Sequence, residues 1–247
     1  MTNSIPIPDE SQRKAAKVVG FCYLFAMATG ILGETYVRGR LIDYENAALT
    51  AQNIMAHKTL FRLGIGAELL TFMSDIALIT SLYIILAPVH RYLALLATFL
   101  RLVAEAVCVM MAAHSFDVLR ILGSGDYLQA FEADQLAALA RLSIGAHVSA
   151  FNVGFVFMGF GSMVFGYLWL KSNYVPKAWG YLGVFGSFLL MAGTFAILLV
   201  PSLAPKLGLI YMVPLFFFEV GMGLWLLLKG LRAAPIIEPA RAGFRTT

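Results

Sequence analysis

The sequence predicts an all-α polytopic membrane protein, a bundle of six transmembrane helices with both termini in the cytoplasm. Of its 247 residues, 60% are hydrophobic and only 13% are charged, whereas a soluble domain has roughly 25% charged residues. The apolar residues form six long stretches, each with the roughly 20 residues that a helix needs to cross a bilayer. The basic residues gather at alternate ends of these stretches, as they do in multi-pass proteins.

The six predicted spans cover residues 15–37, 60–87, 92–122, 137–170, 178–200 and 207–228. The first is too long for a signal peptide and has no cleavage motif after it, so we expect it to remain as a helix. Pro88 closes the second span, and the second to fourth spans exceed the length needed to cross, so they tilt or protrude. Glycines in the fourth and fifth spans suit close helix packing. Pro214 interrupts the sixth.

The spans form one domain over residues 15–230, between a polar tail at 1–14 and a C-terminal tail at 231–247. From residue 233 onward, two prolines and two arginines lead us to expect disorder in the C-terminal tail. The connection at 38–58 mixes apolar and polar residues, which predicts a short helix on the membrane surface. Residues 123–136 begin with the glycine and serine of a turn.

Positive charge is unevenly shared between the two ends of the predicted bundle. One end holds nine basic residues or histidines: Arg13, Lys14, Lys17, His90, Arg91, Lys171, Lys177, Lys229 and Arg232. At the other end five basic residues are diluted by acids. The richer end is expected to face the cytoplasm. The net charge of +4 therefore indicates topology signals and contacts with membrane lipids, and we expect no nucleic-acid partner.

Charged residues also occur inside the spans, where exposure to hydrocarbon would be costly. With a rise of 1.5 Å per residue, Asp75 and Arg101 come out roughly 18 Å and 15 Å from the cytoplasmic end. They define an inner layer with Glu105 and Glu219. Glu34 and Glu68 define an outer layer, with Arg62, Arg141 and His147 at its rim. These nine residues are the candidate binding residues: Glu34, Arg62, Glu68, Asp75, Arg101, Glu105, Arg141, His147 and Glu219.

Local motifs for metal, nucleotide or nucleophilic chemistry are missing from the sequence. There is no HExxH, no paired histidine motif and no CxxC, and the two cysteines, Cys22 and Cys108, sit separately in apolar stretches. One histidine inside a span makes no metal site by itself. We therefore predict no metal and no cofactor, and we assign no catalytic residue.

Four sequence stretches resemble an uncharacterised bacterial membrane family, domain of unknown function number 4386. They are FRLGIGAELL at 61–70, RLVAEA at 101–106, SGDYLQAFEADQL at 124–136 and FNVGFVFMGFGSMVFGYL at 151–168. The likeness covers roughly residues 13–230. It implies a multi-pass protein of the bacterial inner (plasma) membrane, and it implies no activity.

Three functions are compatible with these features. The first is the binding or movement of a small solute or proton through the polar intramembrane site, because intramembrane charges commonly mark such pathways. The second is a membrane-embedded enzyme acting on a lipid-like substrate, with His147 or a carboxylate as general base. The third is an accessory protein whose charges are purely structural. The sequence gives no oligomeric state.

Overall fold

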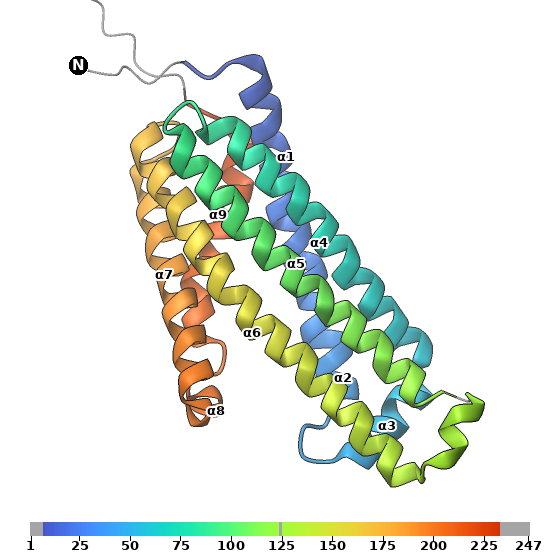
Figure 1. Cartoon of the computed structure of the whole chain (residues 1–247). Coiled ribbons are helices and arrows are strands. Elements are labelled where there is room, and N and C mark those ends of the chain that lie inside the picture. The colour runs from blue at the N-terminus through green and yellow to red at the C-terminus, as the bar shows by residue number, and fades with distance from the viewer. Residues whose placement is uncertain (1–6, 124, 233–247) are drawn as a thin grey trace, which may run out of the picture.

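The computed structural model describes residues 7–123 and 125–232. Six helices in the described residues are long and apolar enough to cross a membrane, which confirms the predicted all-α class and number of spans. The spans are α1 (Glu10–Gly30) with its extension, α4 (Lys58–Leu86), α5 (Arg91–Ile121), α6 (Ala133–Ser172), α7 (Lys177–Leu199) and α9 (Val213–Leu228) together with the short η4 (Ile210–Met212) before it. Figure 1 shows them as one elongated bundle.

The shorter elements lie at one end of this bundle (Figure 1). The first span continues from α1 through the π-helix η1 (Ile31–Arg38) into α2 (Gly39–Leu41). The predicted helix in the connection at 38–58 is present as α3 (Ala47–Ala56). The remaining short elements are η2 (Asp126–Ala130), η3 (Pro201–Leu203), α8 (Ala204–Leu207) and η4 (Ile210–Met212).

The helix α1 begins at Glu10, before the predicted start of the span at residue 15, because a capping box stabilises its first turn. The backbone N–H of Gln12 donates to Asp9 Oδ1 at 2.8 Å, and the N–H of Asp9 donates to Gln12 Oε1 at 3.0 Å. The predicted disorder at 231–247 falls almost entirely on residues 233–247, which lie outside the described residues.

The six spans form a closed ring. Each packs on its neighbour in the chain, in the order α1, α4, α5, α6, α7 and α9, and α9 packs back on α1. Two hydrogen bonds connect the last span and the residues after it to the rest of the ring at one end of the bundle. Lys17 donates to the Leu227 carbonyl, and the Arg232 N–H donates to the Tyr174 carbonyl at 2.8 Å. We call this the basic end and the opposite one the far end. The cytoplasmic location of the basic end remains a prediction.

Two glycines of α6 set the distance to the neighbouring helices. A methyl group at Gly161 would lie 3.0 Å from Arg101 Cγ and 3.1 Å from the Ala97 carbonyl of α5. A methyl group at Gly159 would lie 2.8 Å from the backbone nitrogen of Met191 on α7. The glycines therefore allow backbones to approach closely, as small residues do in membrane helices. This packing holds Arg101 in the middle of the bundle.

Candidate functional site

A half-open cavity of about 700 Å³ lies between the helices of the ring. Glu34 and Gly39 line the part of the cavity that is nearer the far end. Asp75, Arg101 and Glu219 line the part that lies deeper in the bundle. Most of its wall is apolar, with large side chains that include Phe72, Met111, Phe151, Phe155, Met158 and Phe216. Charged groups at two depths interrupt this wall, and they correspond to the two layers that the sequence predicts.

The inner layer is built around the buried guanidinium of Arg101. Its Nη2 lies 3.5 Å from Glu105 Oε1, on the same helix, and 3.7 Å from Asp75 Oδ2 on α4. Its Nη1 donates a hydrogen bond to Ser162 Oγ on α6 at 2.8 Å. One cation thus joins three helices of the ring. Glu219 on α9 lines the same cavity.

Hydroxyl groups lie between the two charged layers. The Oγ atoms of Thr29 on α1 and Thr71 on α4 are 2.6 Å apart, and both residues line the cavity. Thr71 follows Glu68 by three residues and precedes Asp75 by four, so one face of α4 carries all three side chains. The cavity therefore has a continuous polar strip along α4.

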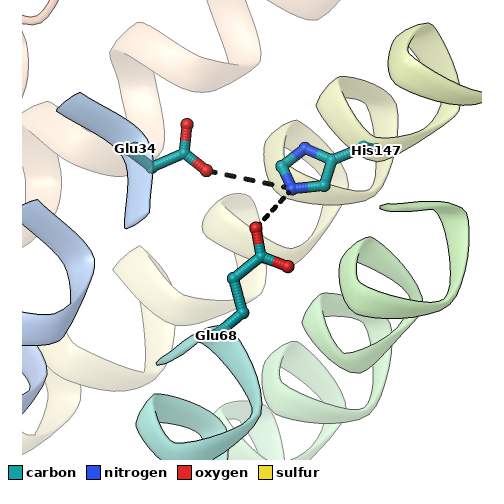
Figure 2. Close-up of side chains that lie close together, drawn as sticks. All are labelled: Glu34, Glu68 and His147. Atoms are coloured by element: carbon teal, nitrogen blue, oxygen red, sulfur yellow. Dashed lines mark hydrogen bonds and ion pairs between the residues drawn. The ribbon is translucent and has the colours of Figure 1, made fainter. Parts of the chain in front are cut away.

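The outer layer brings together Glu34, Glu68 and His147 (Figure 2). His147 Nε2 lies 3.1 Å from Glu68 Oε1 and 3.8 Å from Glu34 Oε1. The three side chains come from η1, α4 and α6, and His147 is only 2% exposed. Glu34 lies within the π-helix, and π-helical turns frequently occur at functional sites. On the other side of Glu34, its Oε2 lies 3.3 Å from Nε of the buried Arg38.

Two predicted rim residues lie elsewhere. Arg62 is exposed on α4, and Arg141 donates two hydrogen bonds to the Tyr44 carbonyl, at 3.2 and 3.3 Å. Neither residue lines the cavity. Glu105 and His147 are also absent from its wall, but each contacts a carboxylate or guanidinium that belongs to it.

Two residues outside the predicted set complete the site. Ser162 accepts the shortest hydrogen bond of Arg101. The sequence did not indicate this role, because a serine in a glycine-rich span is typical of close helix packing. Arg38 holds Glu34 from the side away from His147. Arg38 could have been predicted from the sequence, because it lies one turn after Glu34, where an ion pair within the helix is expected.

The cavity is rich in carboxylates. Of the described residues that line it, four are acidic, namely Glu34, Glu68, Asp75 and Glu219, while Arg101 supplies the single positive charge. An apolar surrounding screens these charges poorly, so their fields extend further than they would in water. The arrangement is therefore suited to hold a positively charged group beside apolar surface.

Comparison with known proteins identifies a family and no characterised relative. No curated protein and no solved structure matches the chain. The family described as Domain of unknown function (DUF4386) matches residues 18–230, which include every residue of both charged layers. Because this match covers most of the chain, the protein belongs to the DUF4386 family.

Proposed function

We propose that this protein binds a small amphipathic cation, or a proton, in the central cavity and moves it across the membrane. The observation that carries the proposal is a cavity of about 700 Å³ that reaches both layers of carboxylates. We place the protein in the bacterial inner membrane with its basic end in the cytoplasm, which agrees with the distribution of Lys and Arg.

The charge of the wall supports a cationic ligand. The wall holds four carboxyl groups against one guanidinium, and a cation bound beside them in a region of low dielectric would favour their ionised forms. An apolar body would contact Phe72, Phe155 and Met158, and its positive group would lie against Asp75 and Glu219. Ligand sites of this kind are mostly apolar with a few placed polar groups.

The inner layer supports the proton alternative. Asp75 Oδ2 and Glu105 Oε1 lie 3.7 Å and 3.5 Å from the same guanidinium nitrogen of Arg101, Nη2. Two carboxylates beside one guanidinium carry one negative charge more than their partner unless one of them holds a proton. A cation entering beside Asp75 would compete with that proton, so binding of a solute would be coupled to proton release.

A binding experiment with a lipophilic cation tests the proposal. Wild-type protein in lipid nanodiscs is titrated with tetraphenylphosphonium by calorimetry. We expect Asp75→Asn and Glu219→Gln each to weaken binding about tenfold or more, because each removes one negative charge from the wall, and tenfold corresponds to about 1.4 kcal/mol. Flux into proteoliposomes then tests movement.

Glu10→Gln is the matched control. Glu10 is exposed at the start of α1, where it pairs with Lys14 at 2.7 Å, so its loss should leave the affinity unchanged. Wild-type protein that fails to bind the probe, or equal affinities in wild type, Asp75→Asn and Glu219→Gln, would contradict the proposal.

A second candidate function is a membrane-embedded enzyme that acts on a lipid-like substrate. It is favoured by the 3.1 Å contact between His147 Nε2 and Glu68 Oε1. A carboxylate that orients an imidazole is a common arrangement for a general base. Incubation of the purified protein with lipid extracts, followed by mass spectrometry, would show product with wild type and none with His147→Ala if this function holds.

A further inference from the structure

We infer that Glu34, Glu68 and His147 form a binding site for one divalent transition-metal ion of the Zn²⁺ class. Each side chain offers one ligand atom, and these atoms all lie within 4.8 Å of one another. Figure 2 shows the carboxylates of Glu34 and Glu68 directed at the same nitrogen of His147. The inference is independent of cation binding at the inner layer.

The spacing of the ligand atoms fits such an ion. His147 Nε2 is 3.1 Å from Glu68 Oε1 and 3.8 Å from Glu34 Oε1. With bonds of about 2.1 Å, these separations correspond to angles at the ion of about 95° and about 130°, on either side of the tetrahedral angle of about 109°. An ion could be held by these three atoms with small side-chain movements.

The ligand set selects the class of metal. Zinc and its first-row neighbours accept a set of one imidazole and two carboxylates, because imidazole nitrogen and carboxylate oxygen are both among their ligands. Mg²⁺ and Ca²⁺ favour sites made entirely of oxygen ligands. The three residues are spread over more than a hundred positions of the chain, so no local sequence motif predicts this site.

The surroundings of the three side chains also point to an ion. Glu34 is held through Oε2 by the buried Arg38 at 3.3 Å, which leaves Oε1 to face His147. Partners of this kind orient metal ligands and tune their affinity. Within the described part of the chain, Oε2 of Glu68 is buried without a hydrogen-bond partner, and it belongs to the carboxylate whose Oε1 faces His147. Buried polar atoms without partners are rare and can mark a missing ion or water.

The position of the site gives the ion access to the cavity. Glu34 and Glu68 line the cavity, whereas His147 lies behind them in the ring of helices. An ion held by three protein ligands would keep a position open towards the cavity for water or a solute group. Three protein ligands with an open position distinguish catalytic zinc sites from structural ones, which have four.

Metal binding to the purified protein tests the inference. The full chain is isolated with a tag that lacks histidine, stripped with a chelator, and titrated with Co²⁺ and Zn²⁺ in nanodiscs. We expect one ion per chain and the visible absorption of Co²⁺ in a low-symmetry site. His147→Ala and Glu68→Gln should each weaken binding about 100-fold or more, since changes to residues that only orient the ligands cost 10–100-fold.

The control is His114→Ala, which removes a half-buried histidine of α5 that belongs to no cluster of potential metal ligands among the described residues. This variant should bind Co²⁺ as wild type does. If His147→Ala and Glu68→Gln do not fold, Glu34→Gln decides, because the Glu34 side chain is 45% exposed and glutamine keeps an amide oxygen for the buried Arg38. Wild type without metal, or equal affinity in wild type and Glu34→Gln, would overturn the inference. Asp75→Asn should keep the metal, which separates this outcome from failure at the inner layer.

Discussion

Arg101 on α5 is held most closely by Ser162 on α6, at 2.8 Å from Nη1 to Oγ. Its two carboxylate partners lie further away, at 3.5 Å for Glu105 and 3.7 Å for Asp75. A neutral hydroxyl therefore fixes the guanidinium, while the carboxylates supply the charge that lets it remain buried. The position of the charge in the bundle thus depends on an uncharged residue.

Ser162→Ala should lower the free energy of unfolding by about 1.5–3 kcal/mol, the range for hydrogen bonds to charged groups. The change leaves a donor of a buried cation without its acceptor. Cys22 and Cys108 are both buried and free, so a thiol-reactive maleimide dye reports thermal unfolding in detergent. Ser149→Ala is the control, because Ser149 is exposed and bonds only to Gly145 of its own helix. Equal midpoints for the two variants would contradict the role of Ser162.

Arg101→Leu should be more damaging, by about 3–5 kcal/mol, because it strands Asp75 and Glu105 without their cation. Replacing all three residues with leucine should regain at least half of that loss, since no unpaired charge then stays in the bundle. The same thermal unfolding assay compares the single and the triple variant. If the triple variant is no more stable than Arg101→Leu, the three charges stabilise the fold by more than compensating one another, which contradicts this prediction.

The spans and the inner layer could be predicted from the sequence because both follow from simple physical rules. The rise per residue of a helix fixes the depth of Asp75 and Arg101, and the cost of charge in hydrocarbon turns both inward. Arg101 and Glu105 are one turn apart, so their contact at 3.5 Å is a local consequence of helix geometry.

The outer layer depends on features that are not local. Glu68 and His147 meet across 79 positions of sequence, and the π-helix that carries Glu34 packs against α4. Arg141 bonds instead to the Tyr44 carbonyl, in a connection whose path helix periodicity does not describe. Depth along a helix was therefore predictable, whereas the direction of each side chain at the far end was not.

Asp9 should make the stability of α1 depend on pH. Hydrogen bonds from the Gln12 backbone N–H and from the Ser11 hydroxyl hold the pKa of Asp9 below its ordinary value of 3.8. The folded state therefore favours the ionised form of Asp9. The stabilisation that ionised Asp9 gives is complete above its ordinary pKa and is lost as the pH falls through the lowered pKa. Asp9→Asn keeps a capping side chain that does not titrate. Wild type should lose more thermal stability between pH 5 and pH 3 than this variant in unfolding followed by circular dichroism, and parallel losses would contradict the assignment.

Two glycines with opposite surroundings test whether close helix packing holds the ring together. A methyl group at Gly159 would lie 2.8 Å from Met191 N and 2.9 Å from the Ser187 carbonyl, which are backbone atoms that cannot turn aside. A methyl group at Gly66 would meet nothing within 4 Å. Both residues lie inside helices, so alanine improves helix propensity by up to about 1 kcal/mol at either position. Gly159→Ala should nevertheless destabilise the protein by about 1–3 kcal/mol through overpacking, whereas Gly66→Ala should be neutral or stabilising. Thermal unfolding of both variants in the same detergent measures the difference, and a stabilised Gly159→Ala would mean that α6 and α7 can separate without cost.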